Sequence, residues 1–185
     1  IIYFKNFKTK NTGKIRRTIS ESLLSYNAFR RVNRDLKAKS FDGIIYYSPS
    51  IFFGSLVNKL SKLWNCKSYL ILRDIFPQNI IDNNLIRENS LVHRYFNYFE
   101  NINYRSADKI GVMSPSIIDF FKDKGKNVSK FEVLYNWARV NQITKDSSHF
   151  RRQLKLEDKI VFFYGGTIGR FQQIINMVNL AKKFV

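Results

Sequence analysis

The sequence predicts an α/β fold built on a parallel sheet, because short apolar segments alternate with segments of helical periodicity. Five segments are apolar throughout instead of alternating with polar residues, which is typical of strands buried on both faces of a parallel sheet. They are Gly43 to Tyr47, Ser68 to Leu72, Lys109 to Met113, Phe131 to Tyr135 and Ile160 to Tyr164. With 185 residues, of which 44% are hydrophobic, the chain can bury a substantial core.

Three segments between these strands are predicted to be amphipathic helices. From about Thr18 to Leu36, apolar residues recur every three or four positions, and Thr18 to Glu21 has the pattern of a capping box. Similar stripes run from Phe53 to Leu63 and from Leu91 to Ile102, the latter after the candidate caps Asn89 and Ser90. After the polar stretch from Asn136 to Ser148, a short helix is predicted at Phe150 to Leu156.

The chain is strongly basic, with 32 Lys and Arg residues against 14 Asp and Glu residues and a formal net charge of +18. Such a surface attracts polyanions or an anionic membrane face. Basic side chains on the polar faces of the first two predicted helices are Arg30, Arg31, Arg34, Lys59 and Lys62. Solvated helix faces in a lysine-rich composition are the alternative explanation.

Cysteine and histidine usage limits the chemistry to be expected. The single cysteine, Cys66, rules out an intrachain disulfide framework and favours a reducing, cytoplasmic setting. Neither His93 nor His149 has a second histidine or cysteine at ligand spacing, so metal binding is not expected. No stretch approaches the ~20 apolar residues of a membrane-spanning helix.

Two serines, Ser48 and Ser114, stand between a predicted strand and a proline. Serine can cap the first amides of a helix and proline suits its first turn, so both junctions should place helix N-termini at the carboxyl edge of the sheet. Ligands of α/β proteins bind at this edge. Two well-capped helices without a ligand are the alternative.

The pair Arg73 and Asp74 directly follows the second predicted strand. A carboxylate at this edge can act as a general base or hold sugar hydroxyls, and Arg73 can balance charge or bind an anion. An ion pair closing a turn before Pro77 is the alternative. Further along, Asn136 and Trp137 could stack on a sugar or base, or anchor a linker.

A glycine-rich loop, Gly165 to Gly169, follows the last predicted strand and precedes a helix with an apolar face from Ile174 to Val185. Glycines allow a ligand to approach the backbone closely, helix amides can hold a phosphate, and Arg170 can add a positive charge. The spacing matches neither the dinucleotide fingerprint nor the nucleoside-triphosphate loop. A plain tight turn is therefore the alternative.

Taken together, five blocks resemble, in order and spacing, the family-four retaining glycosyltransferases of the GT-B fold. The resemblance is to bacterial enzymes of surface-polysaccharide assembly in particular, such as the fucosamine transferases of O-antigen synthesis. The similarity runs from about Phe41 to the end of the chain. The blocks are Ser48 to Gly54, Leu70 to Gln78, Ile110 to Ser116, Val133 to Trp137 and Phe163 to Gly169.

This resemblance implies two facing Rossmann-like domains. Residues 1–136 would form the acceptor-side domain without its first elements, 137–158 the interdomain connection, and 159–185 the first strand, loop and helix of the nucleotide-sugar-binding domain. It also implies sugar transfer with retention at the anomeric carbon, without a required metal or cofactor. The nucleotide sugar would be a substrate.

The resemblance further suggests roles for single residues. Asp74 is expected to contact the acceptor or the transferred sugar, and Arg73 to organise charge in the cleft. More distant relatives often carry a histidine there, whose role cannot be carried over to Arg73. Residues expected to line the cleft on the acceptor side are Ser48, Ser114, Asn136 and Trp137. Residues expected to face the donor diphosphate are Gly165, Gly166, Thr167, Gly169 and Arg170.

The expected partners are a nucleotide sugar, a lipid-linked oligosaccharide acceptor and the anionic surface of the inner membrane, where the protein would be peripheral and cytoplasmic. Nucleic acid is not expected. The family's first strand and its acidic donor-binding pair would lie outside residues 1–185, so transfer by the isolated chain is not expected. The alternatives are an inactive relic or interaction subunit, and a basic α/β module that binds nucleic acid.

Overall fold

The computed structural model describes residues 1–6, 12–36, 41–48, 50–140, 149–169 and 172–184, and it separates into two compact units. Unit 1 comprises Ile1–Asn136 and unit 2 comprises Trp137–Val185. The boundary between the two units falls after Asn136, and the assignment of residues 1–136 to an acceptor-side domain stays a prediction. The finer division of unit 2 into a connection and the start of a domain stays a prediction.

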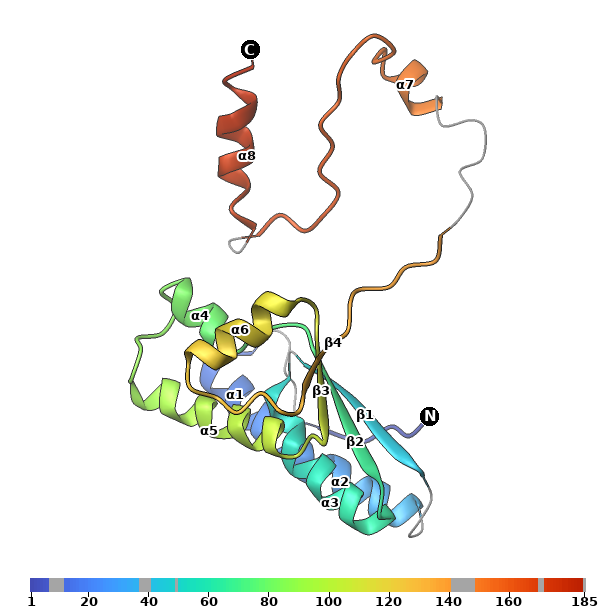
Figure 1. Cartoon of the computed structure of the whole chain (residues 1–185), viewed down its shortest axis with the longest axis vertical. Helices are drawn as coiled ribbons and strands as arrows, with labels where there is room; N and C mark the ends of the chain where they lie inside the picture. The colour runs from blue at the N-terminus through green and yellow to red at the C-terminus, as the bar shows by residue number, and fades with distance from the viewer. Residues whose placement is uncertain (7–11, 37–40, 49, 141–148, 170–171, 185) are drawn as a thin grey trace. The chain divides into compact units, whose positions relative to one another are not determined.

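Unit 1 is built on a four-stranded parallel sheet with the strand order β1-β2-β3-β4 (Figure 1). The strands are β1 (Gly43–Ser48), β2 (Lys67–Leu72), β3 (Lys109–Val112) and β4 (Phe131–Val133). Each overlaps the apolar segment from which it was predicted. The predicted α/β class with a parallel, Rossmann-like sheet is therefore confirmed.

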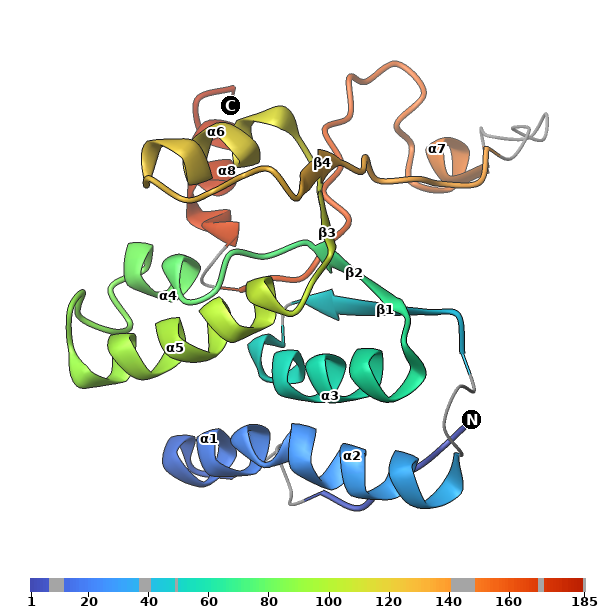
Figure 2. The same ribbon diagram turned by 60° about the horizontal axis from the view of Figure 1, so that its bottom comes forward.

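Helices precede β1 and form the connections between the strands. They are α1 (Lys14–Ser22), α2 (Leu24–Asp35), the 3-10 helix η1 (Ile51–Phe53), α3 (Gly54–Trp64), α4 (Gln78–Asp82), α5 (Leu91–Arg105) and α6 (Pro115–Asp123). Helix α3 packs against both α2 and α5 (Figure 2). Helix α6 packs against β3 and β4. Every connection between neighbouring strands therefore contains a helix, as parallel strands require.

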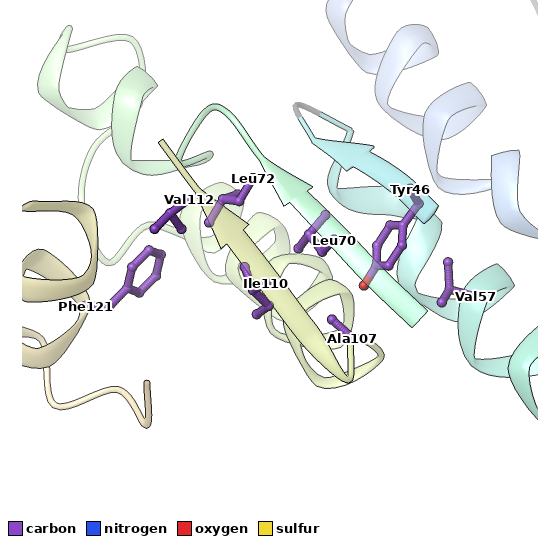
Figure 3. Packing of buried hydrophobic residues seen from close by; sticks show 8 residues of the cluster. All are labelled: Tyr46, Val57, Leu70, Leu72, Ala107, Ile110, Val112 and Phe121. Carbon is purple, nitrogen blue, oxygen red and sulfur yellow. The ribbon is translucent and has the colours of Figure 1, made fainter. Parts of the chain in front are cut away.

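The buried core of unit 1 joins the two central strands to the helices around them (Figure 3). Leu70 and Leu72 of β2 lie beside Ile110 and Val112 of β3, and all four side chains are at most 1% exposed. Phe121 of α6 belongs to the same cluster. Burying each such side chain contributes about 1.5–3 kcal/mol, so this cluster is the main stabilising element of unit 1.

The predicted first helix differs from the structure at its start and in its middle. It begins upstream at Lys14, and Leu23 separates it into α1 and α2. Thr18 lies inside α1, so the predicted capping box is wrong. The carboxylate that the box requires, that of Glu21, instead accepts a hydrogen bond from Arg17 Nε at 2.8 Å.

The prediction that every strand is buried on both faces is also wrong for β1. Ile45 and Tyr47 are 75% and 51% exposed, whereas Tyr46 and Ser48, which point the other way, are buried. Because β1 pairs with β2 alone among the described strands, it is an edge of the sheet. Within the described residues, helices cover only one of its faces.

The described part of unit 2 includes the helices α7 (His149–Gln153) and α8 (Ile174–Ala181). The predicted strand at Ile160 to Tyr164 is not formed, and Ile160, Phe162 and Phe163 are more than four-fifths exposed. A strand needs a neighbour for its backbone hydrogen bonds, and the described part of unit 2 offers no second strand. The predicted strand-loop-helix of a second Rossmann-like domain is therefore corrected to an extended segment, a loop and a helix.

Candidate functional site

The carboxyl ends of the four strands lie in one row. The strand register aligns Ser48 with Leu72, Leu72 with Val112, and Val112 with Val133. The segments that leave the sheet from this row carry most of the residues that the sequence singled out, and Figure 1 shows them at one end of the strands. We call this row the carboxyl edge. Ligands of α/β proteins bind outside such an edge.

Ser48 holds the loop that follows the neighbouring strand. Its side chain is 1% exposed, and its hydroxyl donates to the backbone oxygen of Asp74 at 3.3 Å. It does not cap the next helix, because η1 begins at Ile51 with Ser50 as its N-cap, and Pro49 lies outside the described residues. The structure thus brings two predicted site residues together, with Ser48 supporting the backbone of Asp74.

Asp74 presents an exposed side chain at the carboxyl edge, and Arg73 beside it is half-buried. Among the described residues, the Asp74 carboxylate accepts no hydrogen bond and forms no ion pair, so the alternative of an Arg73–Asp74 pair is not realised. Pro77, which follows a cis peptide bond, is buried and begins the turn into α4. The carboxylate retains all its acceptor sites for a ligand's hydroxyl groups.

The second serine, Ser114, is the N-cap residue of α6, and Pro115 occupies the first helical position as the sequence predicts. The Ser114 hydroxyl makes no capping hydrogen bond. The first amides of α6 therefore start at the carboxyl edge without a side-chain acceptor from their own cap. Asn136 follows β4 at the same edge and is exposed at the end of unit 1.

Glu100 of α5 is an ionisable residue that the sequence analysis missed. It is 7% exposed, and Tyr104 Oη donates to its carboxylate at 2.9 Å. Burial raises the pKa of Glu100 from 4.5 to about 7, while the Tyr104 hydrogen bond and the positive charges of Lys126 and Lys124 oppose this rise. Its spacing from Phe96 and Tyr104, four residues in each direction, was the available signal that it shares their helix face.

The five basic residues predicted to face a membrane divide into two groups. Arg30, Arg31 and Arg34 of α2 line one hollow together with Tyr3, Phe4, Lys5 and Asn27. Lys59 and Lys62 are exposed on α3. Lys59 Nζ lies 5.0 Å from the ring centre of Phe29 in α2, so the two groups occur on neighbouring helices. Asp35 offsets part of the charge, because it pairs with Arg31 at 2.7 Å and with Arg34 at 3.1 Å.

The glycine-rich loop lies in unit 2, and its geometry differs from a phosphate cradle at the start of a helix. Gly165, Gly166 and Thr167 are exposed, and Tyr164 Oη donates to the carbonyl of Thr167 at 3.0 Å. Helix α8 begins only at Ile174, so its amides do not directly follow Gly169. Arg170 lies outside the described residues. The donor-facing role of this loop stays a prediction.

Trp137, the remaining residue predicted for the cleft, is the first residue of unit 2 and is 67% exposed. Within the described residues, no three His, Cys, Asp or Glu side chains gather where they could hold a metal ion. None of the described helices has the length and apolar character needed to cross a bilayer.

Comparison with known proteins gives one informative similarity. No family model matches the chain. A probable glycosyltransferase of Pseudomonas aeruginosa, WbjE, is 25% identical to this chain over 116 residues. That region covers 61% of this chain and 29% of WbjE, so the chain spans much less than two thirds of that relative. The chain is thus distantly similar to a probable bacterial glycosyltransferase and carries a Rossmann-like parallel sheet.

Proposed function

We propose that this chain is part of a retaining glycosyltransferase that acts in bacterial surface-polysaccharide assembly. The enzyme would transfer a sugar from a nucleotide-sugar donor to a lipid-linked or saccharide acceptor. Two observations support the proposal: the distant similarity to a probable glycosyltransferase, and the exposed Asp74 carboxylate at the carboxyl edge of a parallel sheet. The second observation is the basis for assigning a site, because a carboxylate that has no side-chain partner among the described residues suits sugar hydroxyls.

In this proposal, unit 1 binds the acceptor. Asp74 accepts hydrogen bonds from hydroxyls of the acceptor or the transferred sugar, and Ser48 fixes the Asp74 backbone. Arg73, half-buried beside Asp74, balances negative charge in the cleft. Ser114 and Asn136 offer further polar groups at the same edge. No metal or cofactor is required for these roles.

Donor binding is proposed for the glycine-rich loop and Arg170, with Trp137 near the join of the two units. In unit 2 the segment before this loop is extended and exposed, and α8 starts well after Gly169. We therefore expect weak donor binding and no sugar transfer by residues 1–185 alone. Turnover of a nucleotide sugar by this chain would contradict that expectation.

The lipid-linked acceptor would bring the protein to the cytoplasmic face of the inner membrane, as a peripheral protein. Arg30, Arg31, Arg34, Lys59 and Lys62 would attract anionic lipid, at up to ~1 kcal/mol each near such a surface. These residues lie on the neighbouring helices α2 and α3, which supports the proposal that they contact the membrane together.

Ligand binding by the purified chain tests the proposed function. A lipid-linked oligosaccharide, a panel of nucleotide sugars and a single-stranded oligonucleotide would be titrated separately at two salt concentrations. The proposal expects saccharide-dependent binding to the oligosaccharide that persists at the higher salt concentration. Binding to the oligonucleotide alone, abolished by salt, would instead identify a nucleic-acid-binding module.

A further inference from the structure

Helix α1 exposes an apolar stripe to solvent. Ile15, Ile19 and Tyr26, which follows in α2, are 79%, 56% and 53% exposed. With Ser22 they are spaced four, three and four residues apart, which places α1 residues of this set on one helix face. A helix of a folded domain ordinarily turns its apolar stripe toward the core. Because this stripe faces solvent instead, we expect a partner to cover it.

A second exposed stripe lies on α5. Leu91, Tyr95 and Tyr98 are 82%, 36% and 62% exposed and are spaced four and three residues apart. The hydroxyls of Ser22 and Tyr95 are in contact, so the stripes of α1 and α5 meet. We name Ile15, Ile19, Tyr26, Leu91, Tyr95 and Tyr98 together the α1–α5 surface.

Aromatic packing holds the α5 part of this surface in place. The rings of Tyr95 and Tyr98 lie 5.0 and 5.3 Å from the ring of Phe99. Phe99 in turn lies 4.9 Å from Phe52 of η1, which is buried. The two tyrosine rings therefore pack on Phe99 on their inner sides while their outer sides remain exposed, as at an ordered interface.

The charges around this surface favour an anionic partner. Arg16 and Arg17 of α1 and Arg94 of α5 are exposed, and in α2 the guanidinium of Arg30 lies 5.7 Å from the ring centre of Tyr26. The acidic residues of α1 and α5 are Glu21, which is paired with Arg17, and Glu100, which is buried. Neither helix thus places an unpaired, exposed carboxylate beside the apolar stripes.

We propose that the α1–α5 surface inserts into the interface of an anionic lipid bilayer. Isoleucine and leucine side chains would enter the boundary between headgroups and acyl chains, tyrosine hydroxyls would stay at headgroup level, and the arginines would contact lipid phosphates. This inference rests on the membrane partner of the proposed function. It changes the contact from purely electrostatic attraction by α2 and α3 to insertion of α1 and α5.

Cosedimentation of the full chain with vesicles tests insertion. The vesicles contain either phosphatidylcholine alone or phosphatidylcholine with phosphatidylglycerol, and no nucleotide sugar is present. We expect Ile15→Glu and Leu91→Glu each to weaken binding to the anionic vesicles at least tenfold. The matched control is Ile45→Glu, because Ile45 is 75% exposed on β1 and lies outside the α1–α5 surface. Its binding should stay within twofold of the wild type.

A fluorescence measurement reports insertion independently of affinity. Quenching by lipids with brominated acyl chains, measured relative to that of the native Trp64 and Trp137 in the wild type, should increase in Tyr98→Trp and should not increase in Tyr47→Trp. Circular dichroism of all variants confirms that they fold.

Three outcomes would overturn the inference. Wild-type binding by Ile15→Glu and Leu91→Glu, together with lost binding in Arg31→Gln and Arg34→Gln, would leave electrostatic docking in place and remove insertion. Absence of vesicle binding by the wild-type chain would remove both. A dimer in solution that Ile15→Glu dissociates, without vesicle binding, would identify a second copy of this chain as the partner.

Discussion

Glu100 is an acidic residue that the fold buries, although a carboxylate is more stable in water. Its carboxylate is buried in α5 beside Tyr104, and its pKa is raised from 4.5 to about 7. Between these two values the folded chain binds more protons than the unfolded chain. The free energy of unfolding contributed by Glu100 is therefore highest at or below pH 4.5 and falls as the pH rises to about 7.

Glu100→Gln should remove this pH-dependent cost. At pH about 8 we expect the variant to be more stable than the wild type by up to about 3 kcal/mol, because one pKa unit corresponds to about 1.4 kcal/mol. At pH about 4.5 the two proteins should have similar stability. Urea unfolding at both pH values measures the difference, with Glu88→Gln as an exposed control. The same stability change at both pH values would contradict a shifted pKa as the cause.

The place of a single residue could be predicted from the sequence when it depends on the residues next to it in the chain. Arg73 and Asp74 could be placed at the carboxyl edge because they directly follow a continuous apolar strand. The contact of Ser48 with the Asp74 backbone could not be predicted, since it joins the end of β1 to a loop residue 26 positions further along the chain. Burial of Glu100 was likewise hidden, because it depends on which face of α5 meets α3 and η1.

At the scale of elements, the crossing of α3 and α5 depends on Gly54. A Cβ atom at this position would lie 2.6 Å from Asn103 Cα and 2.7 Å from Asn103 N, both backbone atoms of α5. Asn103 is itself fully buried, and Tyr46 Oη donates to its backbone oxygen at 2.6 Å. The backbone of α5 is thus held between β1 and the start of α3.

Gly54→Ala should lower the free energy of unfolding by about 1–3 kcal/mol, the usual cost of adding a methyl group to a filled core. Gly43→Ala is the matched control, because its Cβ would meet only the oxygen of Lys67 at an ordinary 3.8 Å. Chemical denaturation of both variants measures the costs. Equal stability of Gly54→Ala and the wild type would show that the helices can separate without cost.

The strands of unit 1 were predictable because their apolar runs have neighbours with which to pair. The same pattern at Ile160 to Tyr164 failed, because its residues find no strand to pair with in the described part of unit 2. The start of α1 was misplaced because the capping-box pattern from Thr18 to Glu21 lies inside the helix, where Glu21 pairs with Arg17. An apolar run in the sequence indicates which side chains a segment can bury. Whether they are buried depends on the elements that pack or pair with that segment.

At the scale of the whole molecule, stability should reside in unit 1. The core cluster and the apolar side chains packed against it lie between Ile44 and Phe131, and all four strands precede Asn136. Truncation after Asn136 should therefore leave the cooperative thermal transition within a few degrees of that of the full chain. Truncation after Leu72, which removes β3, β4 and α6, should abolish the transition. Circular dichroism melting curves measure both, and loss of the transition in residues 1–136 would contradict the assignment.

The central claim is that the carboxyl edge of unit 1 binds an acceptor sugar through Asp74. Its most direct test is the affinity of Asp74→Asn for a lipid-linked oligosaccharide, relative to wild type. The control is Asp123→Asn, which alters an exposed carboxylate at the opposite end of α6 from Ser114. Loss of a charge-assisted hydrogen bond of about 1.5–3 kcal/mol predicts roughly tenfold or greater weakening for Asp74→Asn, and wild-type affinity for the control. Unchanged affinity in Asp74→Asn, or equal losses in both variants, would contradict the claim.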